Sequence, residues 1–272
     1  MNKKWRQFLK NKFAVLSAIF LILISTAAVC APLVTHYSYD DQNIMERLQG
    51  PSLQHWLGTD TLGRDLYSRI IYGARVSLAV GIVTTFFAAI VGTVVGATAG
   101  YAGGWVDAVL MRGVDVFYIF PSTLMAILFT LLFGRGMLGI LAALSFTSWV
   151  TQARLVRGQV LLTRELLYVE AARALGVNRF SLIFRHILPN ILGPILVSFS
   201  IQIPTNIMTE SFLSFIGLGL QPPHSSWGTL ANEGFRAIHS YPYLMIFPCT
   251  VLFLTLMAFN YLEDGLTRVA LR

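Results

Sequence analysis

Six long stretches of the chain contain no charged residue, and charged segments separate them. They cover residues 13–35, 76–106, 116–134, 136–153, 187–209 and 240–262. A helix of about 20 apolar residues crosses the roughly 30 Å hydrocarbon core of a bilayer, so each stretch predicts one membrane span. The fourth stretch is the shortest and gives the weakest signal. The predicted fold class is an all-α polytopic membrane protein with six transmembrane helices.

The first stretch has two interpretations, because a basic segment precedes it. A cleaved signal peptide has this order of charge and apolar run, but its apolar core is about 7 to 15 residues long. The longer run here favours an uncleaved anchor. With the N-terminus in the cytoplasm, fourteen lysines and arginines lie on the cytoplasmic side of the six spans and six lie outside. This excess predicts a cytoplasmic N-terminus.

The composition agrees with a membrane protein, since 55% of the residues are hydrophobic and 12% are charged. Soluble domains carry about 25% charged residues. The net charge of +7 is concentrated in the N-terminal tail (Lys3, Lys4, Arg6, Lys10 and Lys12) and in residues 151–189. Topology explains these charges without a nucleic-acid partner.

The two cysteines, Cys30 and Cys249, fall within predicted spans near their outer ends. A disulfide bridge between them is conceivable, but two free buried thiols are favoured, and no cysteine or histidine spacing predicts a metal site.

The spans divide the chain into three parts. Residues 1–73 hold the N-terminal tail, the first span and an outside loop that predicts a small folded excursion. Residues 74–263 form the transmembrane core with a large cytoplasmic loop at 151–189, and residues 264–272 form a cytoplasmic tail. A short helix is expected from Thr229 to Ile238, with Trp227 and Tyr241 in an outer interfacial belt.

Two features of the middle spans predict helix packing. A small residue recurs at every fourth position of the second span, at Ala88, Gly92, Gly96 and Gly100. Such a stripe lets a neighbouring helix approach closely. In the third span Pro121 predicts a kink, and Arg112 and Asp115 are spaced to pair on one helix face.

The fifth span carries a polar stripe of Ser198, Gln202, Asn206 and Glu210 on one helix face. A charged residue deep in the bilayer costs roughly 2.5 to 3.5 kcal/mol, so it normally faces protein or a wet cavity. Two interpretations have equal weight at this point. The stripe lines a translocation pathway, with Gln202, Asn206 and Glu210 as its candidates, or it is a polar seam against a neighbouring helix.

The loop between the fourth and fifth spans contains six arginines but has a helix-forming composition. Thr163 is expected to cap a helix that runs to Leu175, and Gly176 to end that helix in the left-handed conformation. Asn178 then caps a second helix, which Pro189 stops or bends. The second helix has an apolar stripe at Phe180, Ile183, Phe184, Ile187 and Leu188.

This loop resembles that of the permease subunits of binding-protein-dependent ATP-binding-cassette importers. Their motif reads E-A-A, three residues, G, nine residues, I-x-L-P, and here it is matched by Glu170, Ala171, Ala172, Gly176, Leu188 and Pro189. His186 replaces the isoleucine, a departure similar to the peptide-transporter branch. The resemblance implies a coupling helix that docks on an ATPase subunit, with Glu170, Ala171, Ala172, Arg173 and Gly176 as the coupling residues.

The whole chain resembles the second, C-type permease of dipeptide, oligopeptide and nickel importers. The matching segments are Gly58-Thr59-Asp60, Gly63-Arg64-Asp65, Gly104-Trp105-Val106-Asp107 with Met111-Arg112 and Asp115, Glu210 to Phe215, and Pro222-Pro223 before Ser226-Trp227-Gly228. The resemblance implies the type I importer permease fold in a bacterial inner membrane. It also implies a B-type permease partner, two ATPase subunits that hold ATP and Mg, and an extracytoplasmic solute-binding protein.

Three other functions are weighed against this one. No G-x-x-x-x-G-K-[ST] loop is present, so an ATPase is excluded and the energy is expected from another subunit. A secondary transporter would need paired ionisable residues near the midplane, where Glu210 stands nearly alone. An intramembrane hydrolase would need a nucleophile or metal motif, and none appears, so no catalytic residue is predicted. Peptides are the first choice of cargo, nickel or its chelates the second, and other small solutes the third.

Overall fold

The computed structural model describes residues 11–270, and its regular elements are all helical. The basic tail residues Lys3, Lys4, Arg6 and Lys10 and the last two residues of the chain lie outside the described part. The helices are α2 (Lys12–Val29), α3 (Ala31–Val34), η1 (Ile44–Glu46), α4 (Leu66–Ala102), α5 (Gly104–Ile119), α6 (Ser122–Phe133), α7 (Met137–Thr163), α8 (Leu167–Ala174), α9 (Arg179–Ser181), η2 (Leu182–Ile187), α10 (Leu188–Phe215), α11 (Trp227–Arg236) and α12 (Tyr243–Ala270).

The expected six spans are not reproduced one for one. Four helical runs are long and apolar enough to cross a bilayer, namely α2, α4, α9 through α10, and α12. A fifth span results if α5 and α6 count as one broken helix. The fourth predicted span became part of α7, a helix of 27 residues whose second half carries arginines. Those charges lower the mean hydropathy of the helix, and α7 is not among the four runs that are long and apolar enough to be a span.

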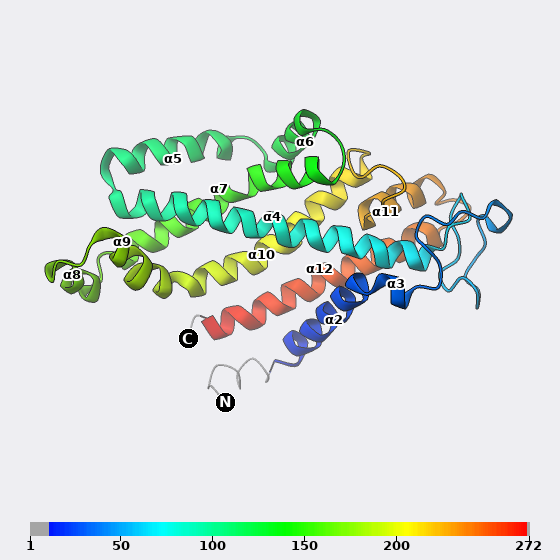
Figure 1. Ribbon diagram of the computed structural model, residues 1–272, viewed down its shortest axis with the longest axis horizontal. Coiled ribbons are helices and arrows are strands. Elements are labelled where there is room, and N and C mark those ends of the chain that lie inside the picture. The colour runs from blue at the N-terminus through cyan, green and yellow to red at the C-terminus, as the bar shows by residue number, and fades with distance from the viewer. Residues whose placement is uncertain (1–10, 271–272) are drawn as a thin grey trace.

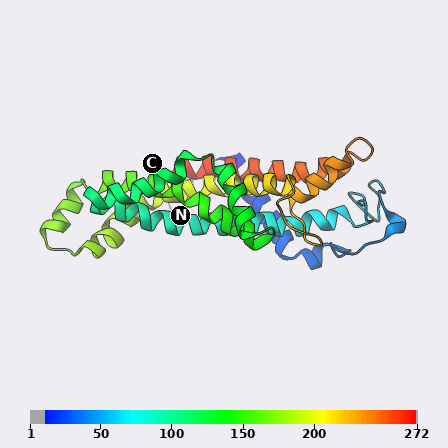
Figure 2. The ribbon, with the colours of Figure 1, turned by 90° about the horizontal axis from the view of Figure 1, so that it is seen from above.

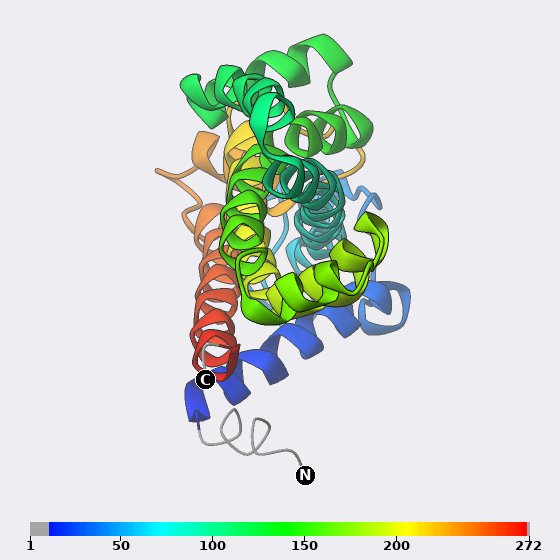
Figure 3. The same cartoon turned by 90° about the vertical axis from the view of Figure 1, so that its left-hand side faces the viewer.

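The long helices lie side by side along the longest axis of an elongated bundle (Figure 1). The two views at right angles agree that α8 lies at one end, and that residues 36–65 lie at the opposite end (Figure 1, Figure 2). Figure 3 looks onto the α8 end, where α8 and α9 cross in front of the bundle. The α8 helix and the 36–65 segment are therefore separated by the length of the bundle.

The predicted stripe of small residues is confirmed as the contact between α4 and α7. A Cβ atom at Gly92 would lie 2.6 Å from the Cβ of Gln152, and one at Gly100 would lie 2.9 Å from the carbonyl oxygen of Arg157. Both distances are shorter than van der Waals contact, so only glycine permits this approach. In lipid, close backbone packing supplies the attraction that holds two helices together.

The predicted kink at Pro121 is a complete break. The helix ends at Ile119, Phe120 adopts an extended conformation, and after Pro121 the α6 helix leaves at 91° to α5. Proline lacks the N–H that would continue the helix. The break turns the chain out of line with the other long helices (Figure 1).

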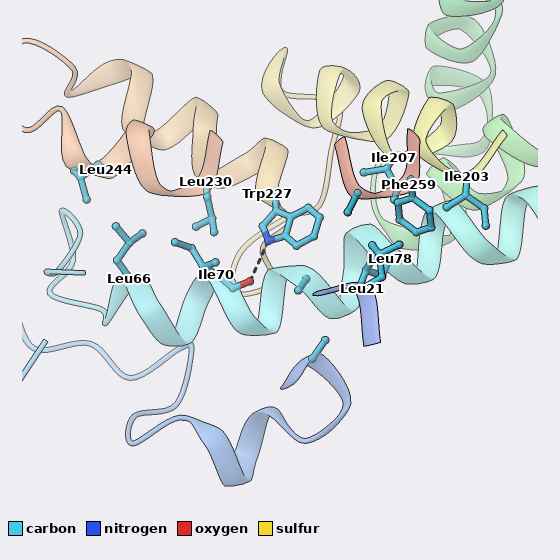
Figure 4. Packing of buried hydrophobic residues seen from close by; sticks show 13 residues of the cluster. Leu21, Leu66, Ile70, Leu78, Ile203, Ile207, Trp227, Leu230, Leu244 and Phe259 are labelled. Atoms are coloured by element: carbon cyan, nitrogen blue, oxygen red, sulfur yellow. Dashed lines mark hydrogen bonds between the residues drawn. The ribbon is translucent and has the colours of Figure 1, made fainter. Parts of the chain in front are cut away.

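The largest apolar cluster joins α2, α4, α10, α11 and α12 (Figure 4). Trp227 lies at its centre, fully buried, and its indole N–H donates to the carbonyl oxygen of Ile70 at 3.1 Å. The expectation that Trp227 belongs to an interfacial belt is therefore wrong. A tryptophan side chain suits either a membrane interface or a protein core, since its indole N–H needs only one polar partner. In this protein the partner is a helix carbonyl oxygen and not a group at the membrane interface.

The 36–65 segment is folded, as predicted. Thr59 and Asp65 form an antiparallel bridge, and His55 is buried with its Nδ1 2.9 Å from the Asp65 carboxylate. The Asp65 side chain also accepts from the amide of Ser68 at 2.7 Å, which caps α4. Cys30 and Cys249 are free and half-buried, as the sequence favours.

Candidate functional site

The loop that carries the family-like motif begins later than expected. The α7 helix continues through Thr163, and α8 starts after Leu166, which has an extended backbone. Thr163 is therefore the last residue of α7, and the prediction that it caps the next helix is wrong. Apolar packing explains the longer helix, because Val156 and Val160 on its last turns are fully buried against the loop.

The corner after α8 has the geometry that the sequence predicts. Gly176 has φ +81°, in the left-handed region that favours glycine. The amide of Val177 donates to the carbonyl oxygen of Ala172 at 3.2 Å, and that of Gly176 donates to Arg173 at 3.0 Å. These two bonds form the Schellman motif that ends a helix.

The α8 helix has one buried and one exposed face. Val169 and Ala172 pack into a cluster with η2 and α7, while Glu170, Ala171 and Arg173 are exposed. Glu170 and Arg173, although three residues apart on one helix, form no ion pair among the described residues. The buried face thus holds α8 against η2 and α7, and the exposed face carries small and charged side chains.

The second helix of the loop runs into the membrane without a stop. Asn178 caps it by accepting from the amide of Ser181 at 2.8 Å, as predicted. The helical run then extends over 37 residues, from Arg179 to Phe215. Pro189 does not end it, and lies in the first turn of α10 directly after the π-helical segment η2.

The π-helical turn also changes which side chains of this helix are buried. Leu182 and Ile187 are buried, whereas Phe180 is 78% exposed and Phe184 is 62% exposed. The predicted apolar stripe is therefore wrong for the two phenylalanines. A π turn holds more residues than an α turn, so the face shifts by about one position along the sequence.

Arginines fasten the end of α7 to α4 and α5. Arg157 forms a two-pronged ion pair with Asp107, at 2.5 and 2.6 Å. Arg154 pairs with Asp115, and Arg164 donates to the carbonyl oxygen of Gly100 at 2.8 Å. The predicted partner of Asp115 was Arg112 on the same helix, and this prediction is wrong. A cross-helix arginine fills that role because α7 packs directly beside α5.

The polar stripe of α10 forms a seam with α4 and α7. Asn206 is its centre, since its amide donates to Thr84 and Thr85 at 2.8 and 3.0 Å and its carbonyl oxygen accepts from Ser148 at 2.9 Å. Gln202 donates to the same oxygen at 3.0 Å and is only half-buried. Every hydrogen-bonding direction of the Asn206 side chain is therefore used within this chain.

Glu210 lies deeper, with no exposed surface. Its carboxylate accepts from the hydroxyls of Ser77 at 3.0 Å and Ser214 at 2.7 Å. The Ser77 oxygen in turn accepts from the amide of Trp227 at 3.3 Å. Glu210 thus connects α10 to α4 and to the start of α11. The three pathway candidates thus lie on one face of α10, and their burial increases from the half-exposed Gln202 to the fully enclosed Glu210.

A buried ionic cluster at the opposite end of the molecule was not predicted. Arg69 donates to Asp60 at 2.7 Å and to Glu233 at 3.1 Å, and Arg64 donates to Asp60 at 2.7 Å. Asp60 and Arg64 belong to motifs that the sequence singles out, but Arg69 and Glu233 do not. They are 164 residues apart, and no periodicity connects residues at such a distance. The cluster fixes α11 to α4.

Comparison with known proteins decides the family. Residues 92–269 match the family described as binding-protein-dependent transport system inner membrane component. This chain belongs to that family. Residues 3–51 also match the N-terminal transmembrane domain of oligopeptide transport permease C. The chain is therefore a multi-pass inner-membrane component of a transport system that works with a binding protein, a permease and an ATPase.

Several curated relatives are similar over 96% of this chain. The glutathione transport system permease protein of Pectobacterium atrosepticum is 43% identical, with 87% of its own length covered. The dipeptide transport system permease protein of Bacillus subtilis is 42% identical, with 82% covered. The oligopeptide transport system permease protein of the same organism is 39% identical, with 85% covered.

Solved structures confirm the fold of the transport component. The chain is similar to an inward-facing MetNI methionine ABC transporter, with a TM-score of 0.61 and 19% identity. The similarity covers 75% of this chain and 96% of that one. A second crystal form gives the same TM-score at 17% identity, with 76% and 98% covered. The predicted type I importer permease fold is confirmed.

Proposed function

We propose that this chain forms half of the translocation pathway of an ATP-driven peptide importer. A B-type permease would form the other half, two ATPase subunits would bind ATP and Mg, and an extracytoplasmic binding protein would deliver the solute. The observation that carries the proposal is the course of the helix from Arg179 to Phe215. It connects the exposed α8 corner at one end of the molecule with the polar seam in the bundle.

The α8 end faces the cytoplasm in this proposal, and so does the N-terminus. Its support is the charge distribution, because cytoplasmic segments of membrane proteins carry an excess of lysine and arginine. Six arginines lie on the last turns of α7 and in the loop that follows, at positions 154, 157, 164, 173, 179 and 185. The 36–65 segment would then lie outside, within reach of a binding protein.

The exposed face of α8 is the surface proposed to contact an ATPase subunit. Driving a two-state transporter from 1:99 to 99:1 takes about 5.5 kcal/mol of differential binding. A surface ion pair of Glu170 would supply about 0 to 1 kcal/mol. Packing of the whole α8 corner is therefore required, with Ala171 and Gly176 setting its fit and Arg173 at its edge. Ala172, which the sequence also proposes as a coupling residue, would act from the buried face by holding α8 against η2 and α7.

The solute would pass along the α10 seam. Gln202 is the candidate closest to the passage, because its side chain is half-exposed in this chain. Asn206 and Glu210 are enclosed here by hydroxyl groups of α4, α7 and α10. Their contribution to the pathway would require the seam to open when α10 moves.

Peptide cargo is supported by the relatives, which are named for transport of dipeptides, oligopeptides and glutathione. The test is uptake of a radiolabelled dipeptide into proteoliposomes that contain the complete complex and its binding protein. We expect uptake with ATP on the ATPase side and none with a proton gradient alone. Uptake of nickel-63 without peptide uptake, or uptake driven by the gradient alone, would contradict the proposal.

A further inference from the structure

The break between α5 and α6 borders a cavity on the side of α7. Its volume is about 360 Å³, within the range of about 300 to 1,000 Å³ that small-ligand sites occupy. The cavity lies at the middle of α7, where Thr151 lines it and the next residue, Gln152, accepts from Ser198 of the α10 stripe at 2.7 Å. Its lining combines apolar and hydroxyl side chains, among them Phe117, Phe120, Met125, Val150, Ser122 and Thr151.

The irregular backbone at this break indicates that the cavity is filled with water and does not face lipid. Phe120 and Pro121 are not helical, and Phe120 is 54% exposed. Irregular backbone at membrane depth is tolerated only where protein covers it or where it lines a water-filled cavity. Ser122 and Thr151, which line the same cavity and carry hydroxyl groups, are exposed residues as well. A surface that faces lipid would not combine an open helix break with these polar groups.

An accessible ion pair lies one turn of α7 beyond the residues that line the cavity. Arg154 follows Val150 and Thr151 on the same face of α7 and pairs with Asp115 of α5. Its guanidinium lies over the ring of Tyr118 at 3.8 Å from the centroid, and Tyr118 itself lines the cavity. Both partners of the pair are exposed, at 40% for Arg154 and 51% for Asp115.

We propose that this cavity is a binding subsite for the transported peptide, with a peptide side chain among the aromatic residues and the peptide carboxylate on Arg154. The inference rests on the proposed peptide importer. An arginine held flat by an aromatic ring presents a fork of donors that matches a carboxylate. Asp115, released from that arginine, is placed to receive the peptide ammonium group. An exposed ion pair is weak in water, so a charged ligand readily exchanges with it.

The decisive variant is Thr151→Phe, which fills the cavity from an exposed position. Thr250→Phe is its control, because Thr250 is exposed on α12, which lies across the bundle from α5 and α6 (Figure 1, Figure 3) and contributes no residue to the cavity. In proteoliposomes with the complete complex, we expect Thr151→Phe to lower the uptake of Phe-Phe at least tenfold and that of Gly-Gly much less. Assembly and basal ATP hydrolysis should equal those of the control.

A labelling experiment gives a second readout. Thr151→Cys, in a background with Cys30→Ala and Cys249→Ala, should react with a maleimide, and saturating peptide with the binding protein should slow that reaction. Equal effects of Thr151→Phe and Thr250→Phe on both peptides would overturn the subsite. Loss of the second permease from the purified Thr151→Phe complex would also overturn it, because the cavity would then be a subunit interface. Absence of ATP-driven peptide uptake by the unmodified complex would instead refute the proposed function itself.

Discussion

Arg69 of α4 and Glu233 of α11 form an ion pair that joins two segments 164 residues apart. Arg69 is 1% exposed and also donates to Asp60, so its charge is compensated on two sides. This contact holds α11 on the N-terminal end of α4. The same short helix begins beside Ser77 and therefore beside Glu210. The ionic cluster and the polar seam are thus connected through α11.

Arg69→Met should destabilise the protein strongly. It leaves the buried Asp60 with one arginine fewer and removes the main partner of Glu233, and breaking a buried ion pair costs about 3 to 5 kcal/mol. Thermal unfolding of the purified protein in detergent measures the effect. The control is Arg47→Met, at an exposed arginine for which the structure shows no ion pair within residues 11–270. Equal melting temperatures of the two variants would show that the cluster contributes little.

Gly92→Val should disrupt the contact between α4 and α7. The added Cβ would lie 2.6 Å from the side chain of Gln152 and 2.8 Å from the carbonyl oxygen of Trp149, so the helices must separate. We expect a large loss of folded protein in fluorescence-detected size-exclusion chromatography. Gly158→Ala on α7 is the control, because its Cβ meets no atom within 4 Å. It should be neutral or stabilising by about 0.5 to 1 kcal/mol.

Gly176→Leu should leave the protein in the membrane but abolish transport and solute-stimulated ATP hydrolysis. No atom lies within 4 Å of the added Cβ, so the fold survives, while the left-handed backbone costs a larger residue about 1 to 2 kcal/mol and favours a different corner. Gly176→Asn is the matched variant, since asparagine tolerates this conformation and should keep much of the activity. Normal uptake by the leucine variant would refute the coupling role of the corner.

Glu210→Ala should be more harmful than Glu210→Gln. Alanine leaves the hydroxyls of Ser77 and Ser214 without their acceptor in a buried site, at a cost of about 1 to 3 kcal/mol for each unsatisfied group. Glutamine keeps the size and one acceptor oxygen. The expected order of melting temperatures is unmodified protein, glutamine variant, alanine variant. An alanine variant with unchanged stability would mean that this carboxylate does not hold α4, α10 and α11 together.

The sequence by itself determined the local conformation of several segments. The glycine stripe of α4, the break at Pro121, the left-handed Gly176 and the cap at Asn178 were predictable, because each depends on a few neighbouring residues. The motif around Glu170 gave the family for the same reason. Its spacing reflects one helix, one corner and the start of another.

Only the tertiary structure decided which polar groups meet. The pairs Arg154 with Asp115, Arg157 with Asp107 and Arg69 with Glu233 all join different helices. Burial of Trp227 and exposure of Phe180 likewise depend on which neighbour covers each side chain. Sequence periodicity fixes the face of a helix on which a residue lies, but the packing of distant helices fixes what that face meets, and a buried charge is stable only where such a partner arrives.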